Sequence, residues 1–262
     1  MRKKKIKKGN LGIAAGFSFI VVGLIFFSFF LRILLLLGES KFDGVNSFTA
    51  VAKEQNLRQV INFSPKSQSI SILNLKDYDN QNLAKSLEIP IDGGFSSFEP
   101  LTAKNLSTQL SKNIFNLQNQ KELNFLDFLR LFLFTNTVKL SSINEETISK
   151  KTNNQNLLSI TSSFFADPAI LEEKQNIEII NATETPGLGN RLANLLTNMG
   201  GNVILVTTED LQDKSQVQYV KKTYTAQRIA RVLGFKLSET KKKSIPDVII
   251  IIGSDSLNSL KF

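Results

Sequence analysis

Residues whose types and spacing suit a ligand site lie in the last third of the chain. The motif PGLG at 186–189 joins an apolar run to an amphipathic stretch, as at a junction between a strand and a helix. The free N–H groups at the start of such a helix can bind an anion such as phosphate. Polar residues also follow two apolar runs, and ligands of open α/β sheets bind at the carboxyl ends of strands. The candidate ligand-binding residues are Asn181, Thr183, Gly187, Gly189 and Asp255.

The same residues also fit a purely structural role. A dinucleotide-binding loop needs a third glycine, and Leu192 stands at that place. Pro186 fixes the entry to a tight turn and Gly187 permits the bend, while Thr183 or Thr185 can cap the helix. Polar residues at strand ends commonly bond to the backbone of their own loop. We therefore expect a tight turn here rather than a nucleotide site, with ligand binding as the alternative.

The residue inventory excludes several kinds of chemistry. The chain has no histidine and no cysteine, so a serine-histidine-aspartate triad, a histidine base, the usual zinc sites and disulfides are impossible. Chemistry would have to use carboxylates, lysine, arginine, tyrosine or a magnesium ion held by oxygens. We assign no catalytic residue, no cofactor site and no metal site from the sequence.

The net charge of +9 comes from the beginning of the chain. Seven of the 32 basic residues precede Glu39, with no acidic residue among them, and the remaining 25 face 23 acidic residues. The seven are Arg2, Lys3, Lys4, Lys5, Lys7, Lys8 and Arg32. Because the rest of the chain is nearly neutral, we expect no nucleic-acid partner.

An apolar stretch follows this basic run. No residue from Leu11 to Leu31 is charged, and 21 helical residues span roughly 31 Å, about the hydrocarbon thickness of a bilayer. The pattern predicts a single transmembrane helix over residues 11–37, with the lipid bilayer as its partner. A cleaved signal peptide is the alternative, but the apolar stretch is longer than a signal peptide needs. The basic residues predict a cytoplasmic N-terminus and place everything after Gly38 outside the cell membrane.

The predicted fold class is α/β, with four segments. They are a basic cytoplasmic tail (1–10), the transmembrane helix (11–37), a mixed α+β middle domain (42–165) and a small α/β domain with a mostly parallel sheet (172–262). In the middle domain, residues 60–75 read as a hairpin, and 102–115 as a helix. Residues 123–134 are apolar on nearly every face, so they predict either a buried helix or one that docks on the membrane surface.

The last 80 residues resemble a known domain. The run NATETPGLGNRLANLLTNMGGNV, then TAQRIARVLG and VIIIIGSD, is similar to the C-terminal domain of LytR-CpsA-Psr proteins, which are bacterial envelope proteins with one N-terminal membrane span. The matching residues are Asn181, Gly187, Ala193, Gly200, Ala226, Gly234, Gly253 and Asp255. This resemblance implies a cell-envelope protein.

The middle domain is similar to a degenerate form of the same family's catalytic domain. The family's enzymes transfer glycopolymers from a polyprenyl-pyrophosphate lipid, with arginines, aspartates and magnesium around the pyrophosphate. In this chain, residues 76–78 read Lys-Asp-Tyr where the family has Pro-Arg-Asp, and Arg58 and Arg130 are the only arginines of the domain. Asp77, Asp79 and Asp92 could still hold a magnesium ion.

Two functions follow as hypotheses. The first is a non-enzymatic, membrane-anchored envelope protein whose C-terminal domain binds a cell-wall glycopolymer or an envelope protein. The second is a diverged glycopolymer transferase acting on polyprenyl-pyrophosphate-linked glycans.

Overall fold

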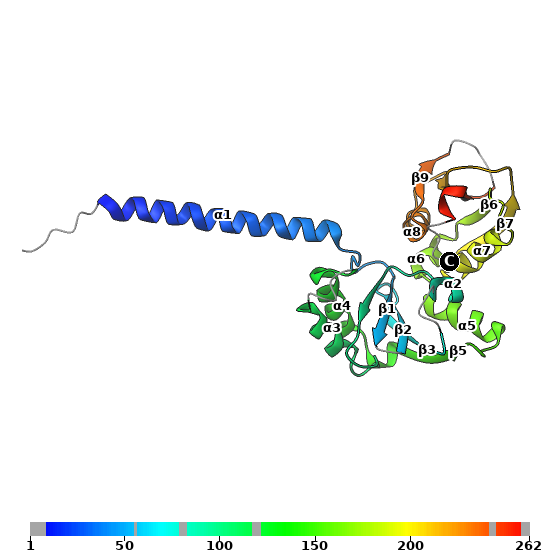
Figure 1. Cartoon of the computed structure of the whole chain (residues 1–262), viewed down its shortest axis with the longest axis horizontal. Helices are drawn as coiled ribbons and strands as arrows, with labels where there is room; N and C mark the ends of the chain where they lie inside the picture. The colour runs from blue at the N-terminus through cyan, green and yellow to red at the C-terminus, as the bar shows by residue number, and fades with distance from the viewer. Residues whose placement is uncertain (1–8, 55–56, 79–82, 117–121, 241–244, 258–262) are drawn as a thin grey trace, which may run out of the picture.

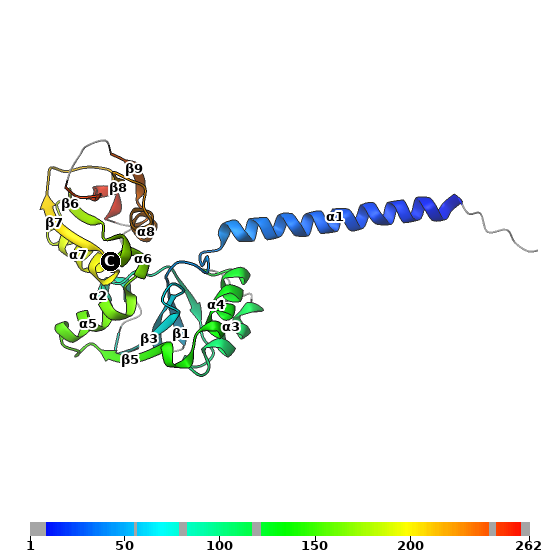
Figure 2. The same ribbon diagram turned by 180° about the vertical axis from the view of Figure 1, so that it is seen from behind.

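The computed structural model describes residues 9–54, 57–78, 83–116, 122–240 and 245–257 of the chain. A long helix, α1 (Gly9–Glu39), stands away from a globular region that contains two sheets with their helices, as the two opposite views agree (Figure 1, Figure 2). Fourteen large apolar side chains between Phe17 and Leu37 are exposed on α1. Among the described residues, no helix combines the length and the apolar character that crossing a membrane requires. The span at 11–37 thus remains a prediction from the sequence.

The first sheet has the strand order β4-β1-β2-β3-β5. Its strands are β1 (Phe48–Glu54), β2 (Leu57–Ser64), β3 (Ser69–Lys76), β4 (Gly93–Ser96) and β5 (Ile143–Ser149). The strands β1, β2 and β3 are antiparallel, whereas β4 and β5 add in parallel at the two edges. The predicted hairpin is confirmed, because Phe63 pairs with Ile70 across the turn. The α/β class is also confirmed, with both sheets mixed in strand direction.

Helices cover both faces of this sheet (Figure 1). They are α2 (Leu83–Leu87), α3 (Leu106–Ile114), α4 (Phe125–Thr137) and α5 (Asn154–Phe165), with a short 3-10 turn, η2 (Leu140–Ser142), before β5. The helices α3 and α4 enclose a core rich in phenylalanine, and α2 and α5 enclose a smaller core on the other face. Asn124 and Asp127 form a capping box that fixes the start of α4.

The second sheet has the order β7-β6-β10-β8-β9. Its elements are α6 (Pro168–Glu173), β6 (Asn176–Asn181), α7 (Leu188–Asn198), β7 (Asn202–Thr208), β8 (Gln216–Tyr219), α8 (Tyr224–Leu233), β9 (Lys236–Glu239), β10 (Val248–Ile252) and the 3-10 turn η3 (Ser254–Ser256). The predicted junction of a strand and a helix at PGLG is confirmed, because β6 precedes this motif and α7 begins within it, at Leu188. Three strand pairs are parallel, but β8 runs antiparallel to β10. The sequence did not predict β8 and β9, because each has four residues and few apolar side chains.

A buried carboxylate joins the end of α1 to the first sheet region. Asp127 Oδ1 accepts hydrogen bonds from Ser40 Oγ at 2.7 Å and from the backbone N–H groups of Lys41 and Phe42 at 2.8 Å. Arg130 Nη1 donates to Ser40 Oγ and to the carbonyl oxygen of Phe42, both at 2.9 Å. The fully buried Phe42 ring then packs in the phenylalanine core. The segment after α1 is therefore held in place rather than acting as a free linker.

A second set of buried polar contacts joins the two sheet regions. Arg228 in α8 is 2% exposed and makes a two-pronged contact with Asp92, at 2.5 Å and 2.8 Å. Within the second region, the hydroxyl of Tyr224 donates to Asp167, the N-cap of α6, at 2.6 Å. Burial raises the pKa of Tyr224, and the bond to Asp167 raises it further. Burial by itself would lower the pKa of Arg228, but the charge of Asp92 more than offsets this effect and raises it.

We expect Asp127→Ala to destabilise the protein by about 3 kcal/mol or more, because each buried donor left without an acceptor costs roughly 1–3 kcal/mol. The measurement is chemical denaturation of the full chain in detergent. Asp213→Ala removes the same charge from an exposed side chain and should leave the midpoint unchanged. Equal midpoints for the two variants would show that the Asp127 contacts contribute nothing to stability.

Candidate functional site

At one edge of the second sheet, two strands end and two others begin. The strands β6 and β10 run in parallel and both end at this edge. Gln216 at the start of β8 pairs with Ile251 near the end of β10, and also with Lys236 at the start of β9. The beginnings of β8 and β9 therefore lie at the carboxyl ends of β6 and β10. This edge is where open α/β sheets bind ligands.

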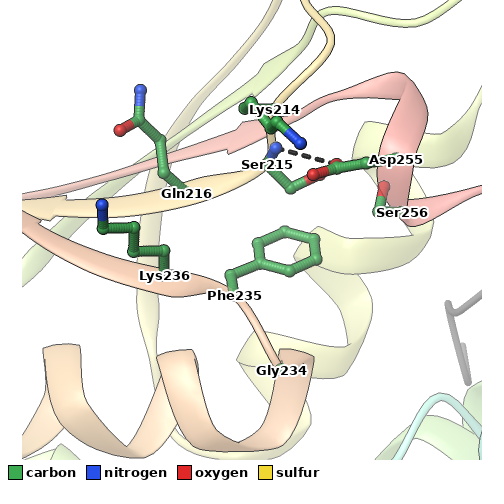
Figure 3. Close-up of a pocket in the computed structure, with 8 residues that line it drawn as sticks. All are labelled: Lys214, Ser215, Gln216, Gly234, Phe235, Lys236, Asp255 and Ser256. Atoms are coloured by element: carbon green, nitrogen blue, oxygen red, sulfur yellow. Dashed lines mark hydrogen bonds between the residues drawn. The ribbon is translucent and has the colours of Figure 1, made fainter.

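A pocket of about 600 Å³ opens at this edge. Its lining residues are Lys214, Ser215, Gln216, Gly234, Phe235, Lys236, Asp255 and Ser256. Figure 3 shows the Phe235 ring between Lys236 on one side and Asp255 with Ser256 on the other. The pocket thus combines two ammonium groups, two hydroxyls and one carboxylate around an aromatic ring. We call it the β8–β9 pocket.

The wall of the β8–β9 pocket is held by a serine and an aspartate. The carboxylate of Asp255 accepts from Ser215 Oγ at 2.6 Å and from the Ser215 N–H at 2.9 Å (Figure 3). These bonds lower the pKa of Asp255, and the nearby charge of Lys214 adds to the effect. Asp255 is therefore ionised at neutral pH. Gly253 lets the neighbouring backbone approach closely, since a Cβ there would lie 2.6 Å from the carbonyl carbon of Lys214.

The candidates at the end of β6 bond to their own loop. Asn181 Nδ2 donates to the carbonyl oxygen of Thr185 at 2.9 Å, and Thr183 Oγ1 donates to Asn181 Oδ1 at 2.7 Å. The prediction that Thr183 or Thr185 caps the following helix is wrong. Gly187 is the N-cap of α7 and no side chain caps it, because the threonine hydroxyl is engaged within the loop, where it accepts from the Thr185 N–H.

The two glycines of the PGLG motif have geometric roles. Gly187 adopts a φ of 78°, in the left-handed region that glycine occupies without strain. A Cβ on Gly189 would lie 2.8 Å from Val206 Cγ1, so Gly189 lets α7 pack closely on the sheet. Both observations agree with the tight-turn interpretation of this motif.

The structure brings one sequence candidate into the pocket and leaves the others beside it. Asp255 lines the β8–β9 pocket, whereas Asn181, Thr183, Gly187 and Gly189 are not among its lining residues. The other seven lining residues were missed from the sequence, among them Lys214, Phe235 and Lys236. Lys214 precedes the short strand β8, Phe235 precedes β9 and Lys236 begins β9. The hydrophobic pattern does not mark these short strands, so no local pattern could have grouped the three residues.

The candidate residues of the middle region serve structural contacts. Arg130 binds the segment that follows α1, and Asp92 binds Arg228. Asp77 lies just after β3 with a φ of 63°. Asp79 lies outside the described residues. The proposed magnesium site made of these aspartates therefore stays a prediction, with one of its three carboxylates already paired to an arginine.

Comparison with known proteins identifies the C-terminal domain. Residues 174–255 match the family model described as LytR cell envelope-related transcriptional attenuator. The resemblance predicted for these residues is confirmed, and they form a LytR-type C-terminal domain. No curated protein matches the chain.

Two solved structures show only a distant likeness. One is described as the LytR-CPS2A-psr family protein YwtF (TagT) with bound octaprenyl pyrophosphate lipid; it is 11% identical, covers 74% of this chain and 94% of its own, and has a TM-score of 0.18. The other, B. subtilis TagT, is 9% identical, covers 84% and 90%, and has a TM-score of 0.19. Likeness at this level carries no argument about this chain, so the relation of residues 42–165 to the catalytic domain stays a prediction.

We expect Gly189→Ala to destabilise the C-terminal domain by about 1–3 kcal/mol, because the added methyl group overpacks the contact between α7 and Val206. The measurement is a thermal melt of the full chain. The control is Asn190→Ala, which changes the exposed neighbouring side chain. Melting of Gly189→Ala at the control's temperature would refute the packing role.

Proposed function

We propose that this chain is a membrane-attached cell-envelope protein whose C-terminal domain binds an anionic cell-wall polymer in the β8–β9 pocket. The observation that carries the proposal is the composition of this pocket, at the ligand-binding edge of a LytR-type domain. In this proposal the middle domain is a non-catalytic support.

The lining groups suit a polymer of sugars and anionic groups. The ammonium groups of Lys214 and Lys236 act as point charges that attract phosphate or carboxylate. Since Asp255 balances one of these charges, the three residues together keep one positive charge. The hydroxyl of Ser256 and the amide of Gln216 are groups that hydrogen-bond to sugar hydroxyls. The ring of Phe235 offers an apolar surface of the kind that lies against a sugar ring.

In this proposal the predicted span at residues 11–37 anchors the protein. The absence of charge from Leu11 to Leu31 and the exposed apolar side chains of α1 support this role. The basic run at residues 2–8 supports a cytoplasmic N-terminus, with both sheet regions outside the cell membrane.

The alternative, a diverged transferase, receives less support. Transfer from a pyrophosphate lipid requires arginine forks or a metal to offset the charge of the pyrophosphate. Of the two arginines in residues 42–165, Arg130 donates to Ser40 and Phe42. Asp92, a predicted magnesium ligand, binds Arg228. These groups would have to leave their partners before they could act on a pyrophosphate.

We expect the variant Lys214→Gln with Lys236→Gln to bind purified wall carrying its anionic polymer at least about tenfold more weakly, because a hydrogen bond to a charged group contributes about 1.5–3 kcal/mol. The measurement is cosedimentation of the full chain, in detergent, with intact cell-wall fragments. Wall stripped of its anionic polymer tests whether that polymer is the ligand.

The matched control is Lys221→Gln with Lys222→Gln, which removes two exposed lysines from the same domain. It should bind as the unmodified chain does, because neither lysine lines the pocket. The two double variants have the same net charge, so a difference between them cannot come from net charge. If the two double variants bind the wall equally weakly, binding is a general electrostatic attraction, which would contradict polymer binding in the β8–β9 pocket. Full binding to stripped wall would contradict the anionic polymer as the ligand.

A further inference from the structure

The outer face of α4 is apolar and partly exposed, and of its residues Leu129 also packs against the phenylalanine core. The side chains of Asp127, Leu131 and Phe134 are on the buried side of this helix. At 100° per residue, Leu126, Leu129 and Leu133 fall on the opposite side. Leu133 is 55% exposed, and the other two are partly exposed. We call these three leucines, together with Phe115, the α4 outer face.

No charge interrupts this face. The only charged residues of α4 are Asp127 and Arg130, and both side chains bond to the segment at residues 40–42. Contiguous exposed apolar surface of this kind marks an interaction site in a folded protein.

Phe115 belongs to the same surface. It follows α3 directly and is 82% exposed, the most exposed aromatic side chain of the globular region among the described residues. Ser107 at the start of α3 bonds to Asn136 at the end of α4, at 2.9 Å. Because the two helices pack in opposite directions, the end of α3 lies toward the beginning of α4. Phe115 therefore lies near the end of α4 that carries Leu126 and Leu129.

The end of α4 that carries these residues is also where α1 joins the globular region. Asp127, in the first turn of α4, binds the backbone of Lys41 and Phe42, just after the last residue of α1, and α1 contacts α4. Both views show α3 and α4 on the side of the globular region from which α1 extends (Figure 1, Figure 2). A membrane that surrounds α1 would meet this side first.

From this placement we infer that the α4 outer face docks on the lipid bilayer, with Phe115, Leu126 and Leu133 among the acyl chains at the membrane surface. The inference rests on the proposed attachment through α1. Helices with an uncharged apolar face bind in this way at the boundary between headgroups and acyl chains. Docking would hold the globular region in a single orientation on the membrane, because residues 40–42 already hold α4 against the end of α1.

The chain contains no tryptophan, so an introduced tryptophan reports its surroundings without background. The experiment places the full chain in vesicles of phosphatidylglycerol and phosphatidylethanolamine, with lipids brominated near the headgroup end of the acyl chains. Phe115→Trp and Leu133→Trp should each lose about half of their fluorescence or more, since bromine quenches only at close approach and interfacial side chains reach this depth. Both positions are exposed, so neither variant disturbs the core.

The matched control is Leu158→Trp in α5, an exposed leucine on the far side of the first sheet, which should keep its fluorescence. Phe17→Trp in α1, near the far end of the predicted span and exposed, tests the attachment separately, because only a spanning α1 brings this position to the bromine level of the opposite leaflet. Unquenched tryptophan at 115 and 133 would overturn the docking, whatever Phe17→Trp shows. Quenching at 115 and 133 without quenching at 17 would support docking and contradict attachment through α1.

Discussion

The buried guanidinium of Arg228 fixes the arrangement of the two sheet regions. It extends from α8 of the second region to Asp92 of the first, and the backbone N–H of Thr49 holds the second oxygen of that carboxylate at 2.8 Å. An uncompensated buried charge costs several kcal/mol, whereas a pair with two hydrogen bonds is tolerated. The buried charge of Arg228 therefore needs the carboxylate of Asp92 beside it. This pair holds the two regions together as long as water does not reach it.

A similar logic applies at the other end of the middle region. Asp127 can be buried because three donors from residues 40–42 and one from Asn124 satisfy its oxygens. The buried Asp127 and the partly buried Asp92 thus join three segments of the chain in series, namely α1, the first sheet region and the LytR-type domain. The β8–β9 pocket consequently has a fixed position relative to α1, which the proposed presentation of a polymer site at a membrane would require.

The elements of the fold could be predicted from the sequence where a long apolar period marks them. The hairpin of β2 and β3, the helices α4, α7 and α8, and the continuous apolar strand β10 all follow this rule. Contacts between distant residues could not be predicted, because Arg228 and Asp92 are 136 positions apart and no local pattern pairs them. The same reason explains why Asp255 was recognised beside its apolar strand while Lys214 and Lys236 were missed.

Hydrogen exchange of the full chain, in the presence and absence of purified anionic wall polymer, is the sharpest test of polymer binding in the β8–β9 pocket. We expect slower exchange of backbone amides at residues 214–216, 234–236 and 253–256, because a ligand in the pocket shields the strand ends that form it. Protection confined to residues 42–165, around Arg58 and Arg130, would contradict binding in this pocket and place polymer recognition in the middle domain.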